Sequence, residues 1–233
     1  MKNILKKYSN QEKWETHFSK LNKISFPSEG IIRIFLGNYP KMQFNYKKKQ
    51  KILDLGYGDG RHLLFFNKLN LSVYGVEISE KINQITKKLL KKNRINNVVL
   101  KKGNNEKIPF NNEYFEHLVS WNSCYYMEDK NSKFENHVKE MARVLKRSGY
   151  IVLSIPKFNC FIFDKSKKYK KKYAIIKNDY FKKRNGQIMR CFKNAEEIKH
   201  EFSKYFNNFV ISEIDMDWFG LKYSWHIIIA KKK

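Results

Sequence analysis

The sequence has few of the features that mark membrane proteins, secreted proteins and disulfide-bonded proteins. Its apolar runs are short, such as Ile227–Ala230, and none approaches the roughly 20 residues needed to cross a bilayer. The first residues, Met1–Lys7, lack the apolar segment of a signal peptide. Cys124, Cys160 and Cys191 are far apart and form no CxxC pair. These absences predict a cytoplasmic protein without a membrane span, a disulfide or a cysteine-bound metal.

Acidic residues are scarce relative to basic ones. Lys and Arg total 48, Asp and Glu total 22, and the net charge is +26. Such a charge favours an anionic partner: nucleic acid, a membrane surface, or a phosphorylated or carboxylated substrate. A compositional explanation competes, because Lys, Asn and Ile are abundant together, as in proteins from AT-rich genomes. Lys also far outnumbers Arg, whose bidentate fork suits phosphate. The compositional explanation is favoured, and the anionic partner stays open.

No internal repeat and no Pro- or Ser-rich linker divides the chain. With 233 residues, 42% of them hydrophobic, the chain is long enough for one domain with a well-buried core. We therefore expect a single domain over residues 1–233. Its expected parts are an N-terminal helical cap, a regular core, an inserted cap, and a C-terminal helix with a strand pair, at residues 1–49, 50–156, 157–192 and 193–233.

Hydrophobic periodicity predicts alternating strands and helices through the regular core. The expected strands cover residues 51–55, 72–76, 97–101, 115–120 and 150–155, and the expected helices cover residues 61–69, 79–93 and 133–145. Parallel strands need crossover connections of this kind, so the pattern predicts a three-layer α/β/α sandwich.

The flanking segments are less regular. Helices are expected at 12–21 and from Pro27 onward. In the inserted cap, Asn185-Gly186 predicts a hairpin between strands at 180–184 and 187–192. The chain is expected to end with a helix and two antiparallel strands, at residues 195–206, 209–216 and 223–230.

A glycine-rich loop, Gly56-Tyr57-Gly58-Asp59-Gly60, joins the first core strand to a helix. Glycine permits positive φ and close approach of a ligand, and the helix N-terminus offers free N–H groups. The dinucleotide fingerprint requires glycine where this chain has Arg61, and no P-loop Gly-Lys-Ser/Thr follows. Asp54 before the loop fits a cationic ligand. Glu77, which ends the next strand, can accept two hydrogen bonds from a ribose diol or act as a helix N-terminal acid.

Five segments, taken in order, resemble the motifs of class I S-adenosylmethionine-dependent methyltransferases, in the small-molecule group that includes the quinone-biosynthesis type. They are Asp54–Gly60, Val76–Ser79, Gly103–Phe110, Phe115–Ser120 and Arg143–Tyr150. The resemblance implies a Rossmann-like fold whose mostly parallel, seven-stranded sheet has an antiparallel C-terminal strand. It also implies S-adenosyl-L-methionine as the cofactor of the core at residues 50–156, with the substrate cap at 157–192.

The resemblance assigns cofactor-binding roles to Asp54, Gly56, Tyr57, Gly58, Gly60, Glu77, Ile78, Asn104, Asn105, Glu106 and Trp121. Where the family carries Gly-Asp-Ala, this chain has Gly103-Asn104-Asn105. We expect the amide oxygen of Asn104 to accept the adenine amino group, with loss of charge. The backbone N–H of Asn105 or Glu106 is expected to face adenine N1.

Aromatic and apolar side chains are expected to cover the cofactor. Ile78 and Ile108 are candidates beside the adenine, and Tyr8 or Trp14 is a candidate at the methionine end. Trp14 has a competing role as the core anchor of its own helix, and this role is slightly favoured.

The candidate catalytic residues are His17, Arg61 and Tyr125. Each also has a structural explanation: an exposed helix residue, a cap of the loop, and a packing aromatic. Further acceptor-site candidates are His62, Asn122, Tyr126 and Arg190. The loop at residues 122–125 lacks the proline-containing motifs of nucleic-acid amino and cytosine C5 methyltransferases, and no metal-binding carboxylate set is found. The sequence thus predicts a metal-independent enzyme with a small-molecule substrate.

The favoured function is O-methylation of a small anionic metabolite. A phosphorylated or phosphoramidate-like intermediate of surface-polysaccharide decoration is its most specific version. The alternative is an RNA-binding or RNA-methylating protein, based on the lysines and aromatics of Lys165–Tyr173. A third possibility is a cofactor-binding module without activity, suggested by Asn104. The sequence leaves the oligomeric state open.

Overall fold

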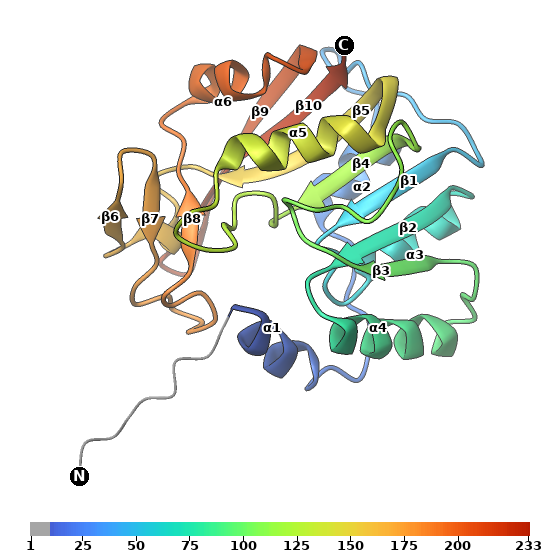
Figure 1. Ribbon diagram of the computed structural model, residues 1–233, viewed down its shortest axis with the longest axis horizontal. Coiled ribbons are helices and arrows are strands. Elements are labelled where there is room, and N and C mark those ends of the chain that lie inside the picture. The colour runs from blue at the N-terminus through green and yellow to red at the C-terminus, as the bar shows by residue number, and fades with distance from the viewer. Residues whose placement is uncertain (1–9) are drawn as a thin grey trace.

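The computed structural model describes residues 10–233, so the candidate Tyr8 lies outside the described residues (Figure 1). The helices are α1 (Asn10–Phe18), α2 (Glu29–Leu36), α3 (Arg61–Lys68), α4 (Glu80–Lys92), α5 (Phe134–Val144), the short 3-10 helix η1 (Phe161–Phe163) and α6 (Ala195–Phe202). The strands are β1 (Lys51–Leu55), β2 (Ser72–Glu77), β3 (Val99–Lys102), β4 (Phe115–Trp121), β5 (Leu145–Pro156), β6 (Lys167–Tyr169), β7 (Tyr173–Ile175), β8 (Ile188–Arg190), β9 (Phe206–Trp218) and β10 (Leu221–Lys232).

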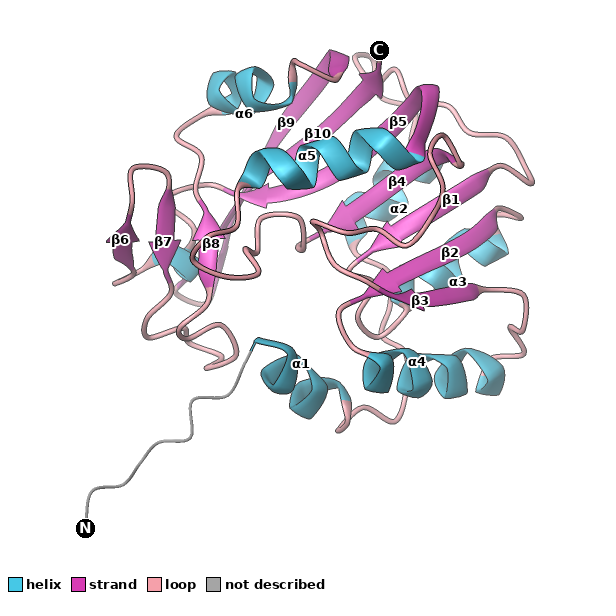
Figure 2. Ribbon diagram, viewed as in Figure 1, coloured by secondary structure: helices cyan, strands magenta, loops and turns pink. Residues whose placement is uncertain are grey.

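Seven strands form the central sheet in the order β3-β2-β1-β4-β5-β10-β9. Strands β1 to β5 pair in parallel, while β10 pairs antiparallel with both β5 and β9. Helix α5 crosses one face of the sheet, and α2 and α3 lie on the other (Figure 2). The predicted Rossmann-like α/β fold, with its antiparallel C-terminal strand, is confirmed.

The strands form where continuous apolar segments are buried from both sides. On β1, Ile52 and Leu53 have no exposed surface, and on β5 the stretch 151–153 is equally buried. Strands covered on both faces need such continuous apolar runs. Helix α4 begins where the Ser79 hydroxyl accepts the N–H of Lys81 at 3.1 Å. This cap fixes the chain directly after β2, at the edge of the sheet that carries the candidate site.

The predicted hairpin around Asn185-Gly186 is wrong. Residues 180–184 form no strand, and β8 pairs with β7 in a separate three-stranded sheet, β6-β7-β8. The reason is local: the carboxylate of Asp179 accepts the backbone N–H of Lys183 at 2.9 Å and of Arg184 at 3.2 Å. Those bonds fold the segment into a turn, which the sequence pattern did not reveal.

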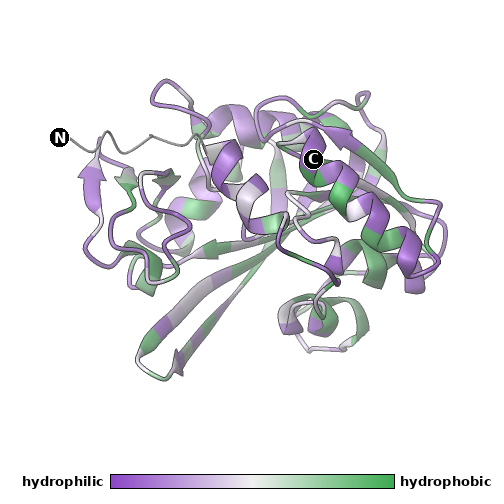
Figure 3. Ribbon diagram, turned by 90° about the horizontal axis from the view of Figure 1, so that it is seen from below, coloured by the Kyte–Doolittle hydropathy of each residue, from purple (hydrophilic) through white to green (hydrophobic). Residues whose placement is uncertain are grey.

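The last two strands are longer than predicted. Strand β9 begins at Phe206, and the preceding helix accordingly ends at Phe202 instead of residue 206. Together β9 and β10 form a ribbon that projects from the body of the molecule (Figure 3). Among residues 10–233, the structure contains no helix that is long and apolar enough to cross a membrane.

His117 on β4 makes the stability of the fold sensitive to acid. The side chain is 2% exposed, and its Nε2 lies 2.9 Å from Oε1 of Gln50. Burial lowers the pKa of His117 to about 4, although Glu116 opposes the shift. The pKa of His117 in the folded state lies below its unfolded value of about 6.5. The contribution of the neutral His117 to stability is therefore fully present above pH 6.5 and is lost as the pH falls toward 4.

We therefore predict that the free energy of unfolding falls by about 2 kcal/mol more in the wild type than in His117→Gln between pH 7 and pH 5. Urea unfolding at both pH values measures this difference. His200→Gln, at an exposed position on α6, controls for removal of a histidine from the surface. Equal losses in the wild type and His117→Gln would contradict the prediction.

Candidate cofactor and acceptor site

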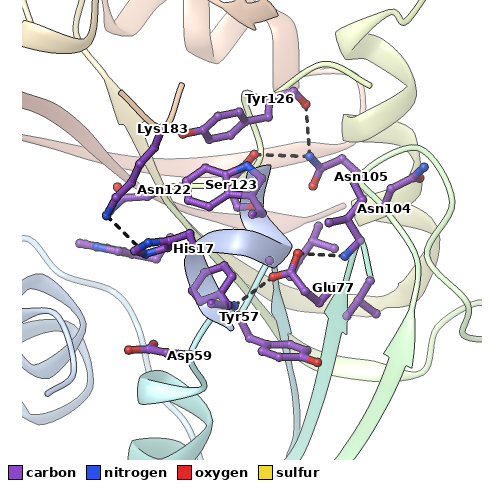
Figure 4. Close-up of a pocket in the computed structure, with 18 of the residues that line it drawn as sticks. His17, Tyr57, Asp59, Glu77, Asn104, Asn105, Asn122, Ser123, Tyr126 and Lys183 are labelled. Carbon is purple, nitrogen blue, oxygen red and sulfur yellow. Dashed lines mark hydrogen bonds between the residues drawn. The ribbon is translucent and has the colours of Figure 1, made fainter. Parts of the chain in front are cut away.

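A cavity of about 310 Å³ lies at the carboxyl ends of the parallel strands (Figure 4). Its walls come from α1, the glycine loop, the ends of β2 and β3, the loop after β4, and the cap segment 183–187. In open α/β sheets ligands bind at this edge. Of the eleven predicted cofactor-binding residues, the eight that line the cavity are Gly56, Tyr57, Gly58, Glu77, Ile78, Asn104, Asn105 and Trp121.

The glycine loop approaches the cavity with its backbone. Gly56 and Gly58 have φ values of +77° and +58°, which favour glycine. A Cβ on Gly58 would lie 2.8 Å from the ring of Phe18 on α1. Gly60 also has a positive φ but lies outside the cavity, where a Cβ would meet Thr86 of α4 at 2.7 Å. Its role is to let α3 begin close to α4.

Glu77 connects the end of β2 to the glycine loop. One carboxylate oxygen accepts the N–H of Gly58 at 3.0 Å, and the other accepts the N–H of Ile78 at 2.9 Å. Burial raises the pKa of Glu77, and these two backbone bonds oppose that shift. Each oxygen has a second lone pair, so the carboxylate retains acceptor capacity toward the cavity for a pair of ribose hydroxyls.

Asp54 lies beneath the loop and does not line the cavity. It is 1% exposed, its Oδ2 has no hydrogen-bond partner among the described residues, and Nδ1 of His62 is 3.8 Å away. Burial raises the pKa of Asp54 well above its usual value, and burial lowers the pKa of His62 to about 3. An orphaned, buried carboxyl oxygen under the glycine loop fits a ligand that brings a positive group, such as the amino and sulfonium groups of S-adenosylmethionine.

The adenine end differs from the expectation in one respect. The amide oxygen of Asn104 accepts the N–H of Glu106 at 3.0 Å and that of Lys107 at 2.8 Å. A carbonyl oxygen has two lone pairs, so both are used within the turn and none remains for the adenine amino group. Glu106 itself lies outside the cavity and faces His137, with Oε1 to Nε2 at 3.9 Å.

Asn105 positions the loop that follows β4. Its side-chain amide donates to the carbonyls of Ser123 at 3.4 Å and Tyr126 at 3.3 Å (Figure 4). Trp121 at the end of β4 lines the cavity, and its ring lies where a Cβ on Gly30 of α2 would stand. The glycine therefore permits α2 to pack against Trp121.

The structure brings two of the three candidate catalytic residues into the cavity, His17 and Arg61. Tyr125 is fully buried, its hydroxyl has no hydrogen-bond partner in the described part of the chain, and its ring stacks on Tyr126 with centroids 4.9 Å apart. Its neighbour Tyr126 lines the cavity instead. Tyr125 therefore lies in the core as a packing aromatic, which is the structural explanation that competed with a catalytic role for this residue.

Some of the other candidates for the acceptor and cofactor sites also line the cavity, and others are buried away from it. His62 and Asn122 line the cavity, whereas Arg190 is fully buried elsewhere and pairs with Glu197 and Glu201 at 3.0 and 2.8 Å. Ile108 is buried and does not line the cavity, while Trp14 does and also packs edge-on against Tyr126.

Several cavity residues were not found from the sequence, notably Phe18, Asp59, Ser123, Met127, Glu128, Lys183, Arg184 and Gln187. Lys183 and Arg184 reach the cavity through the turn that Asp179 organises. The sequence placed a substrate cap at residues 157–192, but a turn of this kind carries no hydrophobic period, so the pattern did not single out these two residues.

Residues 52–149 match the family model described as a methyltransferase domain. The uncharacterized methyltransferase YcgJ of Bacillus subtilis is 26% identical over 107 residues, which cover 46% of this chain and 41% of that protein. The match thus spans about two fifths of the curated relative's length.

Solved structures share the fold over most of the chain. A methyltransferase from Methanosarcina mazei that uses S-adenosylmethionine has a TM-score of 0.64 at 19% identity, covering 84% of this chain and 98% of that one. Another from Thermotoga maritima, described as a possible histamine N-methyltransferase, has a TM-score of 0.56 at 22% identity, covering 80% and 84%. At these identities the neighbours show the fold alone.

The fold, the glycine loop and the match of residues 52–149 to a methyltransferase domain together support a class I S-adenosylmethionine-dependent methyltransferase. This match and the fold imply S-adenosyl-L-methionine as the cofactor. The cavity fits that cofactor: Glu77 offers acceptors for the ribose diol, and the glycine backbone allows close contact, with the buried Asp54 beneath the loop.

We predict that Glu77→Gln weakens binding of S-adenosylhomocysteine by about tenfold or more, because an amide keeps only one of the two oxygens that a diol needs. Isothermal titration calorimetry measures the dissociation constant, and thermal melting shows whether the loop remains folded. Glu80→Gln, at an exposed position outside the cavity, is the matched control. Unchanged affinity in Glu77→Gln would remove the ribose assignment.

Proposed function

We propose that the protein transfers a methyl group from S-adenosylmethionine to an oxygen atom of a small anionic metabolite. The observation that carries the proposal is the set of basic side chains around the cavity: His17, Arg61, Lys183 and Arg184. They face the cavity from three separate segments, so they surround a common space instead of forming one charged run. Such a space favours an anion.

Arg61 and Arg184 already have carboxylate partners, whereas Lys183 forms no ion pair with a carboxylate among residues 10–233. Nε of Arg61 lies 2.9 Å from Asp59, and Arg184 lies 3.0 Å from Asp179. Nζ of Lys183 lies 3.4 Å from Nε2 of His17 (Figure 4). Burial and the nearby Arg184 lower the pKa of Lys183, and burial together with Lys183 lowers that of His17. An anionic group between them would relieve this repulsion.

The reaction requires the protein mainly to align the methyl donor with the acceptor. The cofactor supplies an activated methyl group, and in-line positioning in a dry pocket is worth roughly 7–11 kcal/mol. A phosphate or carboxylate oxygen is already anionic and needs no general base. If the acceptor were instead a hydroxyl, His17 would be the base, since its lowered pKa keeps the imidazole neutral.

The most specific form of the proposal is a phosphorylated or phosphoramidate-like intermediate of surface-polysaccharide decoration. It is supported by the basic cavity and by the loop after β4, which lacks the proline-containing motifs of nucleic-acid methyltransferases. The test is methyl transfer from labelled S-adenosylmethionine to a panel of sugar phosphates, carboxylates, neutral quinones and RNA. Turnover on quinones or RNA, with none on the anionic acceptors, would overturn the proposal and favour the corresponding alternative.

Lys183 provides a sharper test once an acceptor is found. We predict that Lys183→Gln raises KM for the acceptor by about tenfold and changes kcat by less than about threefold, because a charge contact to the acceptor anion supports binding and is not strengthened in the transition state. The matched control is Lys182→Gln, an exposed neighbour outside the cavity. A fall in kcat at constant KM would contradict this role for Lys183.

A further inference from the structure

The cavity contains a carboxylate that no assignment above uses. Glu128 lies in the loop after β4 and lines the cavity. Burial raises the pKa of Glu128 to about 7, the neighbouring Glu106, Asp129 and Glu77 act in the same direction, and the backbone N–H of Asn105 opposes them. A half-buried acid at this position is costly to ionise. It therefore calls for a ligand group that donates a hydrogen bond to the carboxylate.

The position of Glu128 matches a gap in the cofactor site. Adenine carries an exocyclic amino group that needs an acceptor when it is buried. The expected acceptor, the amide oxygen of Asn104, is fully used by the N–H groups of Glu106 and Lys107. Asn104, Asn105 and Glu128 line the same cavity, and the backbone N–H of Asn105 acts on the Glu128 carboxylate. The missing acceptor and the unassigned carboxylate thus lie together.

We propose that Glu128 accepts the adenine amino group of the cofactor, the role that the sequence assigns to Asn104. The inference rests on the proposed use of S-adenosylmethionine. The backbone N–H of Asn105 donates to the Glu128 carboxylate and orients it. A carboxylate has two oxygens, so acceptor capacity remains for the adenine amino group. Glu128 is a binding residue and takes no part in methyl transfer.

An aspartate at position 104 could both hold the turn and accept the adenine amino group, whereas the asparagine can do only the first. A carboxylate has two oxygens, so one can hold the turn through Glu106 and Lys107 while the other faces the adenine. Asn104 has one oxygen, and the turn uses it. In this chain two residues, Asn104 and Glu128, therefore share the two roles that one aspartate could perform: holding the turn and accepting the adenine amino group. The substitution Asn104→Asp is therefore a rescue variant for the loss of Glu128.

The experiment compares two ligands by calorimetry: S-adenosylhomocysteine and its analogue with hydrogen in place of the 6-amino group. We expect the wild type to bind the analogue about tenfold or more weakly, as for loss of a hydrogen bond to a charged group. In Glu128→Leu the ratio of the two dissociation constants should fall to about one. Adding Asn104→Asp to Glu128→Leu should restore most of the ratio. Glu135→Leu, at an exposed position on α5, is the control and should keep the wild-type ratio.

The ratio separates binding from folding, since a structural role of Glu128 would weaken both ligands equally. An unchanged ratio in Glu128→Leu, or a ratio near one in the wild type, would overturn the inference and leave the proposed function intact. Failure of the wild type to bind S-adenosylhomocysteine at all would overturn the proposed function, and the inference with it.

A pH series gives an independent readout. Because the pKa of Glu128 is about 7, most of its carboxylate becomes protonated between pH 8 and pH 6. We expect the wild type to lose about tenfold in affinity for S-adenosylhomocysteine over this range, while the analogue and Glu128→Leu lose far less. Glu77, Glu106 and Asp129 face Glu128, and His137 faces Glu106, but they act on both ligands alike. Equal pH dependence for the two ligands would contradict the role of Glu128.

Discussion

The hydrogen bond from the N–H of Gly58 to the carboxylate of Glu77 is the interaction on which the cavity depends. It joins the loop after β1 to the end of β2. These two strands pair in parallel, with Leu55 opposite Val76, so their carboxyl ends necessarily meet at one edge. The glycine backbone supplies the positive φ that turns the N–H toward the acid. Once this bond fixes the floor, α1, the loop after β4 and the cap can enclose the space above it.

The parts of the fold that the sequence predicted are those set by local pattern. Strand and helix alternation between residues 51 and 155 implied a parallel sheet, because parallel strands require crossovers. The glycine loop follows a buried strand and Glu77 ends the next one, so their place at the sheet edge follows from the chain itself. Eight of the eleven residues that the family resemblance assigned to the cofactor line the cavity.

The parts that the sequence did not predict depend on side-chain contacts in irregular segments. In the loop after β4, Tyr125 turns into the core and Tyr126 into the cavity, and no period distinguishes adjacent residues there. Asp179 converts an expected strand into a turn through its carboxylate. Asn104 was assigned by likeness to an aspartate, but its single amide oxygen is used by the turn. In each case the outcome depends on side-chain contacts and hydrogen bonds in the folded protein. No regular spacing in the sequence indicates which of these contacts form.

The charges around the cavity are separated in a way that suits the proposed reaction. Acidic side chains, Asp54, Glu77 and Glu128, lie at or beneath the cofactor end, and the basic side chains His17 and Lys183 lie toward α1 and the cap. Methyl transfer to an anionic oxygen removes one positive charge from the cofactor and one negative charge from the acceptor. The attraction for the sulfonium and the attraction between the basic side chains and the acceptor therefore weaken at the same moment. The contacts of Glu77 with the ribose and of Glu128 with the adenine are unchanged by the reaction, so the demethylated cofactor still binds through them.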